Sequence, residues 1–307
     1  MSNERVSIPE AERVARNLEL SMTRRVDGLL RGDYLGVLPG PGWEVGEARS
    51  YVPGDDVRRI DWNLTARTGH VHVRDTVVER ELEATLAIDL SPSMAFGTAL
   101  YEKRDLSLAA AAAVGFLATS TGGRLGTLVL EPTGEVIVPP RGGRNHVIGV
   151  IRKVADMRPP DGSGRCDLRL GFRSVGRIAR RRGLVCVVSD FLDSGSWARE
   201  LRALSQRHEV LAVEVVDPRE LELPDIGEVA FVDPVSGEHM TVSTSNRGLR
   251  ERYAEAAAVQ RDDIAQALAG AGASHLRLQT DRDWVRDIVE FAALRKRVVS
   301  NGRGPAA

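Results

Sequence analysis

The stretch ATLAIDLSPSM, residues 84–94, decides the fold of this chain. Its first residues are mostly apolar and lack the polar alternation of a half-exposed strand, which is typical of a strand buried on both faces. The run ends at Asp89, which is followed by Ser91 and Ser93. An alanine-rich helical segment comes next, at 103–121. A buried strand, a polar loop and then a helix indicate the first unit of a parallel α/β sheet.

The rest of the chain repeats this alternation. Further strands are predicted at 124–131, 135–141, 183–191, 209–218 and 274–280, and further helices at 145–157, 166–181, 196–208, 246–270 and 283–299. The linker between 124–131 and 135–141 is short enough for an antiparallel hairpin, and a second hairpin is predicted at 229–243. The predicted fold class is therefore α/β: a doubly wound, mostly parallel, Rossmann-like sheet with one antiparallel edge strand.

The first part of the chain has a different pattern. Residues 9–31 carry apolar residues spaced among charges as in an amphipathic helix, and HVHVRDTVVE (70–79) alternates as a strand does. We therefore expect an N-terminal helix and a small β-rich unit over residues 1–83, an α/β domain over 84–300 and a disordered tail at 301–307.

Composition narrows the range of functions. The chain has 307 residues, of which 42% are hydrophobic and 28% charged, with a net charge of -1. Near-neutral charge gives no electrostatic reason to expect nucleic acid as a partner. The two cysteines fit a reducing compartment, and no apolar run approaches the roughly 20 residues of a membrane span. With no apolar signal region at the N-terminus, we expect a cytoplasmic protein without a membrane span.

The polar residues that follow the predicted strands form a candidate site. Asp89, Ser91 and Ser93 follow one strand, and Asp190 ends another. Because ligands of such sheets bind at the carboxyl ends of the strands, these side chains are expected at one edge. All four carry hard oxygen donors, which Mg²⁺ or Mn²⁺ prefers. The alternative is that they only cap the helices that follow.

Two stretches resemble known proteins. DLSPSM (89–94), followed by VVSDF (187–191), resembles the metal-ion-dependent adhesion site of von Willebrand factor type A domains. RSYVPGDDVRRIDWNLTAR (49–67) resembles the bacterial family called "domain of unknown function 58", and this resemblance covers residues 40–245. Such proteins are often encoded beside MoxR-type AAA+ ATPases. The resemblance therefore implies a type-A-like domain that works with such an ATPase, or its client, in a chaperone-like or assembly role.

The resemblance also implies roles for individual residues. In type A domains, two serines and a threonine contact the metal directly, the aspartates act mainly through water, and an open position accepts a partner's carboxylate. Transferred to this chain, Ser91 and Ser93 are direct ligands, and Asp89 and Asp190 lie in the outer shell.

One position departs from the family pattern. Cys166 stands where the threonine is expected, and a thiol is a soft ligand that suits Mg²⁺ poorly. The neighbouring Asp167, or Ser163, is a candidate replacement. Without a replacement, the resemblance implies a weak or vestigial metal site.

The charged block at 55–67 has two interpretations. In the structural one, arginine and aspartate pairs hold the β-rich unit against the main sheet, with Trp62 buried beneath. In the functional one, the block is part of a docking surface, because Trp and Arg are favoured anchors of interfaces. The candidate partner-binding residues are then Trp62, Arg58 and Arg67.

Two function classes remain. The prediction is a non-enzymatic protein-interaction module, and the alternative is a metal-dependent hydrolase or phosphatase at the same strand-end site. An aspartyl-phosphate enzyme needs a second carboxylate two residues after the first, where this chain has Ser91. The sequence also has no P-loop, GxSxG or HExxH motif.

Overall fold

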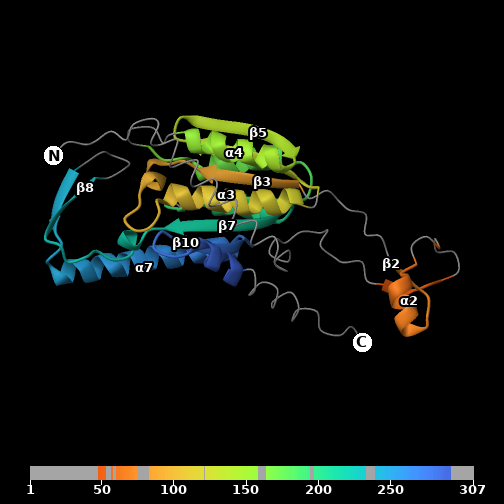
Figure 1. The fold of residues 1–307 in the computed structure, drawn as a ribbon. Coiled ribbons are helices and arrows are strands. Elements are labelled where there is room, and N and C mark those ends of the chain that lie inside the picture. Colours follow the sequence, from red (N-terminus) through yellow and green to blue (C-terminus); the bar gives the residue numbers. More distant parts are fainter. Residues whose placement is uncertain are drawn as a thin grey trace.

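The structure is a computed structural model, shown as a ribbon in Figure 1. It describes residues 48–52, 57, 60–74, 83–120, 122–157, 164–193, 197–232 and 239–291. The helix predicted at 9–31 and the tail predicted at 301–307 lie outside the described residues.

The centre of the structure is a six-stranded sheet with the order β10-β7-β6-β3-β4-β5. Its strands are β3 (Glu83–Asp89), β4 (Arg124–Glu131), β5 (Gly134–Gly142), β6 (Leu184–Ser189), β7 (Glu209–Val216) and β10 (Ser274–Gln279). Every neighbouring pair is parallel except β4 and β5, which are antiparallel and place β5 at the edge. The predicted fold class, a mostly parallel sheet with one antiparallel edge strand, is confirmed.

Helices cover both faces of this sheet, as Figure 1 shows. They are α3 (Lys103–Ser120), α4 (Arg144–Asp156), α5 (Leu168–Ile178), α6 (Ala198–Ser205) and α7 (Arg247–Gly270). On β3, Leu86 and Ile88 join the core that contains α3 and α4, whereas Ala87 joins the core on the opposite face, with α5 and α6. Successive strand residues point to opposite faces, so a strand buried on both sides reads as the continuous apolar run seen in the sequence.

The order of the strands creates a switch point. The chain builds β3, β4 and β5 outward on one side and then returns to place β6 on the other side of β3. In open α/β sheets the loops that leave two such central strands diverge at their carboxyl ends and leave a crevice. Asp89 ends β3 and Asp190 directly follows β6, so both lie at this crevice.

Smaller elements lie around the sheet. The second predicted hairpin is confirmed as the antiparallel pair β8 (Glu228–Val232) and β9 (His239–Ser243). Two short 3₁₀ helices, η3 (Pro92–Ala95) and η4 (Pro218–Glu220), follow β3 and β7. Among the described residues, no helix is both long enough and apolar enough to cross a membrane.

The N-terminal unit contains a helix that the sequence pattern did not predict. β1 (Ala48–Ser50) pairs with β2 (His72–Arg74), and α2 (Trp62–Thr68) lies between them in sequence. The Asp61 carboxylate accepts hydrogen bonds from the backbone N–H groups at the start of α2, and Gly69 ends it with φ of 73°. A helix of 7 residues without a buried face leaves no periodic apolar signal, so only this Asp and Gly pair could have indicated it.

The structural interpretation of the charged block at 55–67 placed Trp62 in a buried position, and that part of it is wrong. Its side chain is 69% exposed, and α2 has no buried residue. Figure 1 shows this unit apart from the six-stranded sheet. The division of the chain near residue 83 stays a prediction.

Candidate functional site

The structure brings four of the five predicted metal-site residues together. A small cavity of about 40 Å³ opens at the carboxyl ends of β3 and β6. Its lining comprises Asp89, Ser91, Ser93, Gly164, Arg165, Cys166, Asp190, Leu192 and Asp193. Because a buried water needs roughly 10–15 Å³ of such space, the cavity has room for an ion and a water molecule. The strand-end prediction therefore identified residues that share one site.

Asp89 is buried and hydrogen-bonded at both carboxylate oxygens. Its Oδ1 accepts from the Ser91 backbone N–H at 2.8 Å and from the Ser91 hydroxyl at 2.5 Å, and its Oδ2 accepts from the Ser189 hydroxyl at 2.6 Å. Burial, and then the charge of Asp190, raise the pKa of Asp89, although the hydrogen bonds from the two serines oppose this. Ser91 makes no side-chain capping bond to η3, so helix capping does not account for its hydroxyl.

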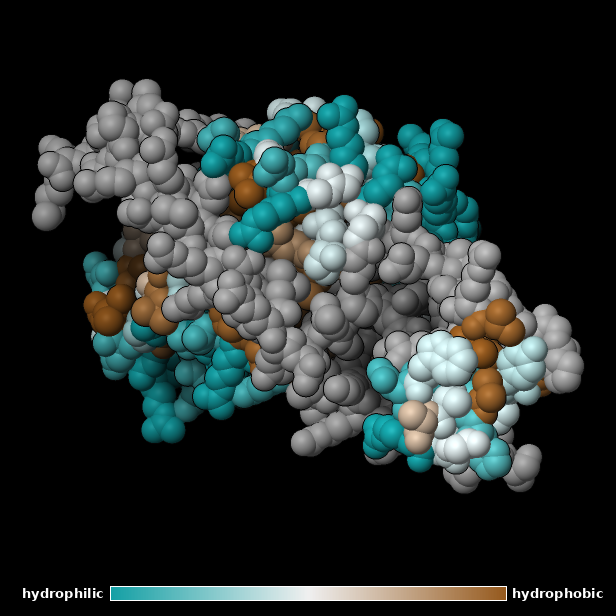
Figure 2. Space-filling model, turned by 45° about the vertical axis from the view of Figure 1, so that its right-hand side comes forward, coloured by the Kyte–Doolittle hydropathy of each residue, from teal (hydrophilic) through white to brown (hydrophobic). Residues whose placement is uncertain are grey.

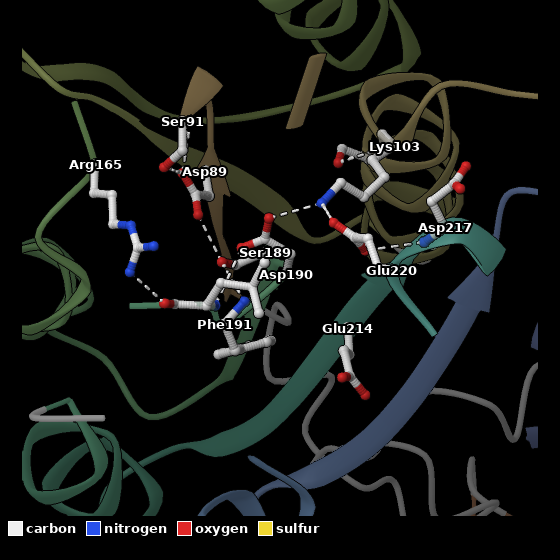
Figure 3. Close-up of polar contacts among 12 residues, drawn as sticks. Asp89, Ser91, Lys103, Arg165, Ser189, Asp190, Phe191, Glu214, Asp217 and Glu220 are labelled. Atoms are coloured by element: carbon white, nitrogen blue, oxygen red, sulfur yellow. Dashed lines mark hydrogen bonds and ion pairs between the residues drawn. The ribbon is translucent and has the colours of Figure 1, made fainter. Parts of the chain in front are cut away.

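Asp190 faces a buried lysine that the sequence analysis did not single out. Lys103, the first residue of α3, is 0% exposed, and its Nζ lies 2.8 Å from Asp190 Oδ2 and 2.5 Å from Glu220 Oε1. Burial pushes the pKa of Asp190 upward, but the Lys103 ammonium and hydrogen bonds, including one from Ser93, hold it below its usual value. Figure 3 shows Lys103 between the two carboxylates. Asp190 is therefore ionised, and the ammonium of Lys103 is its counter-ion within the protein.

This ion pair continues into a larger buried network. Arg261 of α7 donates from Nη1 to the Asp190 backbone carbonyl at 3.1 Å and to Glu214 Oε1 at 3.1 Å, and from Nη2 to Glu220 Oε2 at 3.2 Å. Glu214, which is fully buried in β7, also pairs with His275 and Arg277 of β10. The charged Glu214 within the apolar strand EVLAVEVV is the sequence signal that could have indicated this network.

The contacts of Cys166 and Asp167 do not support a role as a metal ligand for either residue. The Cys166 thiol donates to the Leu130 carbonyl at 3.2 Å, and burial raises its pKa far above the usual thiol value, so the sulfur stays protonated. Asp167 caps α5 by accepting from the Leu170 N–H at 3.0 Å, and it does not line the cavity. The unpredicted Asp193 lines it instead. Ser163 lies outside the described residues.

The backbone turn after Asp190 is strained. Phe191 has φ of 55°, and among the described residues it alone is a non-glycine with positive φ. Such a conformation costs roughly 1–2 kcal/mol for an L-residue. Its N–H donates to the Ser189 hydroxyl at 3.0 Å, and its ring lies 5.3 Å from that of Trp197. These contacts hold the turn that directs Asp190 into the cavity.

Comparison with known proteins places the whole arrangement in a family. A family model described as "Protein of unknown function DUF58" matches residues 47–263, which include every residue of the site. The chain belongs to this family. An uncharacterized Mycobacterium tuberculosis protein is 48% identical over 289 residues, which is 94% of this chain and 91% of the relative. An uncharacterized Mycobacterium avium protein is 44% identical over 167 residues, which is 54% of this chain and 98% of the relative.

Comparison with solved structures found further similar chains. An aerotolerance-related membrane protein from Bacteroides fragilis has a TM-score of 0.47 at 13% identity, covering 70% of this chain and 99% of that chain. The SpRpn10 VWA domain has a TM-score of 0.38 at 10% identity, covering 68% of this chain and 94% of that chain. The predicted membership of DUF58 is confirmed by the family model.

Two of the predicted partner-binding residues of this DUF58 protein, Trp62 and Arg67, do not line this cavity. Trp62 and Arg67 are exposed on α2, whereas Arg58 lies outside the described residues. Val52, Val57 and Val71 are exposed on the same unit, and Figure 2 shows apolar atoms on its surface at the lower right. The described residues of this unit therefore form a surface that is separate from the lining of the cavity.

Proposed function

We propose that this DUF58 protein is a protein-interaction module that binds Mg²⁺ or Mn²⁺ at the carboxyl edge of its sheet. Through that ion it binds an acidic side chain of a partner protein. The observation that carries the proposal is the cavity shared by Asp89, at the end of β3, Ser91 and Ser93 in the loop after it, and Asp190, directly after β6. Hard oxygen donors from two strands, at the switch point of the sheet, are the donor set that these cations prefer.

The hydrogen bonds of Ser91 support a direct ligand role. Its hydroxyl donates its proton to Asp89 Oδ1 and accepts one hydrogen bond, from the Cys166 N–H at 3.2 Å. A serine oxygen has two lone pairs, so one is left to face a cation. Ser93 is the second candidate hydroxyl ligand, and the carboxylates of Asp89 and Asp190 would hold the ion through water. The bound ion would supply an open position for a carboxylate oxygen.

The third hydroxyl of the type A pattern has no replacement in this cavity among the described residues. The protonated Cys166 thiol supplies no ligand, and Asp167 is engaged at the start of α5. Asp193 is the remaining candidate, acting through water. We therefore expect weaker binding than a site with three hydroxyl ligands, because water replaces the missing group.

The proposed partner is a MoxR-type AAA+ ATPase or its client, in a chaperone-like or assembly role in the cytoplasm. This part rests on the resemblance described above for residues 40–245. The exposed Trp62 and Arg67 offer a second contact surface, because such side chains anchor protein interfaces.

The geometry argues against one form of the hydrolase or phosphatase alternative, in which Asp89 is the nucleophile. A nucleophilic aspartate needs an accessible oxygen, but both oxygens of Asp89 accept hydrogen bonds and the residue is 3% exposed. The module is therefore proposed to be non-catalytic.

Titration calorimetry with Mg²⁺ and Mn²⁺ tests this function. We expect the wild type to bind and Asp89→Ala to lose binding, with circular dichroism confirming that the variant is folded. Asp167→Ala is the matched control, since it removes a neighbouring carboxylate that does not line the cavity. Capture of a purified MoxR-type ATPase, with and without chelator, then tests the partner. Absence of binding at millimolar metal would overturn the proposal.

A further inference from the structure

The Lys103 side chain has an unusual place in the candidate site. It is fully buried and does not itself line the cavity, but its ammonium contacts Asp190, which does line it, and also Glu220. We infer that Lys103 is an internal cation that competes with the divalent metal for Asp190 and thereby sets the metal affinity of the site. This inference rests on the proposed function, because it assigns a regulator of affinity to the same cavity.

The hydrogen bonds of Asp190 are the first support. Its Oδ2 accepts from Lys103 Nζ at 2.8 Å, and its Oδ1 accepts from the Leu192 N–H at 3.2 Å. Both oxygens are therefore engaged inside the protein. Each oxygen keeps a second lone pair that a metal-bound water can use, but the Lys103 ammonium already holds Oδ2 and competes for its negative charge.

Glu220 is the second support, because it provides another partner for the displaced ammonium. Lys103 Nζ lies 2.5 Å from Glu220 Oε1. The other oxygen of Glu220 is held by the Asp217 N–H at 3.1 Å and by Arg261 Nη2 at 3.2 Å, so this carboxylate keeps its position. Lys103 can thus stay paired while Asp190 turns to a metal ion, and Figure 3 shows the two carboxylates on either side of the ammonium.

Charge is the third support. Asp89 and Asp190 would together offer two negative charges to a cation, but the Lys103 ammonium, which Asp190 shares with Glu220, offsets part of this charge within the site. Coulomb attraction scales with the product of the charges, so this neutralisation weakens the attraction for a divalent ion considerably. Removing the ammonium should therefore tighten metal binding.

The test is calorimetry of Mg²⁺ and Mn²⁺ binding to Lys103→Met, which removes the charge and keeps much of the side-chain volume. We expect Lys103→Met to bind at least about tenfold more tightly than the wild type, given the strength of close charge interactions. Lys153→Met is the matched control, because Lys153 is exposed on α4, and its affinity should stay within about twofold. Metal should also raise the melting temperature of Lys103→Met more than that of the wild type.

A double-mutant cycle with Asp190→Asn identifies the route of the effect. If Lys103 acts through Asp190, Lys103→Met gains little affinity in the Asp190→Asn background. An equal gain in both backgrounds would show an unspecific charge effect and overturn the inference. Should Lys103→Met fail to fold, Lys103→Gln keeps a hydrogen-bond donor for Asp190 and serves in its place.

The outcomes separate the inference from the proposed function. If the wild type binds metal and Lys103→Met binds equally or more weakly, the inference fails and the metal site stands. If only Lys103→Met binds, the proposed function fails for the native protein, whereas the inference that Lys103 opposes metal binding holds. If neither protein binds metal at millimolar concentration, the proposed function fails, and the inference fails with it.

Discussion

The Ser189 hydroxyl at the end of β6 donates a 2.6 Å hydrogen bond to Asp89 Oδ2 at the end of β3. This contact between side chains joins the two central strands at the point where their loops diverge. The same hydroxyl accepts from the Phe191 N–H at 3.0 Å. One serine therefore holds both the carboxylate of Asp89 and the turn that positions Asp190.

Ser189→Ala should lower the free energy of unfolding by about 1–3 kcal/mol, because it leaves a buried carboxylate oxygen and a buried N–H without their partner. Urea denaturation measures this change. Ser107→Ala is the matched control: it is also buried, but its hydroxyl only donates to the Lys103 carbonyl within α3. An equal decrease in the free energy of unfolding for the two variants would show that the hydrogen bond between β3 and β6 stabilises the protein no more than one within a helix.

Asp217→Asn should destabilise the protein at pH 7 and change its acid sensitivity. The buried carboxylate of Asp217 accepts hydrogen bonds from the Thr98 hydroxyl at 2.6 Å and the Thr280 hydroxyl at 2.7 Å. Burial alone would raise the pKa of Asp217, but these hydrogen bonds hold it below the usual value. A lowered pKa means that the stabilisation is present above the unfolded pKa of about 3.9 and is lost as the pH falls through the folded value.

The measurement is urea denaturation of the wild type and Asp217→Asn at several values between pH 7 and pH 3. The difference in unfolding free energy, expected to be about 1–3 kcal/mol at pH 7, should narrow as the pH falls below about 4. A difference that stays constant across this range would contradict the assigned role of the carboxylate.

Gly183→Ala should strongly destabilise the sheet. A Cβ at Gly183 would lie 2.0 Å from the Glu83 carbonyl oxygen, so the start of β6 could no longer approach β3. Overpacking of this kind typically lowers the free energy of unfolding by roughly 1–3 kcal/mol or more, and thermal denaturation measures this loss of stability. Gly149→Ala is the opposite control, since nothing lies within 4 Å of its added Cβ. On an exposed helical position it should stabilise the protein by about 0.5–1 kcal/mol.

Trp62→Ala should leave stability within about 0.5 kcal/mol of the wild type, because the side chain is exposed and packs against no core. It should weaken capture of a purified MoxR-type ATPase if the N-terminal unit is a docking surface. Trp197→Ala is the contrasting variant, since Trp197 is buried against Phe172 and Phe191, and it should cost about 3–5 kcal/mol. A large decrease in the free energy of unfolding of Trp62→Ala would contradict this prediction and support the structural interpretation of Trp62.

Much of the fold was predictable because its strands are buried on both faces. Such strands appear as apolar runs, and β3, β6 and β7 stand out in this way. Asp89 and Asp190 were predictable as site residues for the same reason, since a charge at the end of a buried strand marks the edge of the sheet. In contrast, α2 is too short for a periodic signal, and adjacency to Cys166 gave a misleading reason to include Asp167.

The sequence by itself determined the α/β class, the antiparallel edge strand and the edge at which the polar residues gather. These follow from apolar periodicity, linker length and strand direction, which are local properties. Only the tertiary structure decided that Lys103 and Glu220 reach Asp190, that Asp193 rather than Asp167 lines the cavity, and that Trp62 is exposed. These facts depend on how side chains from separate helices and loops are oriented when they pack, and the sequence does not indicate which charged residues of distant elements will pair.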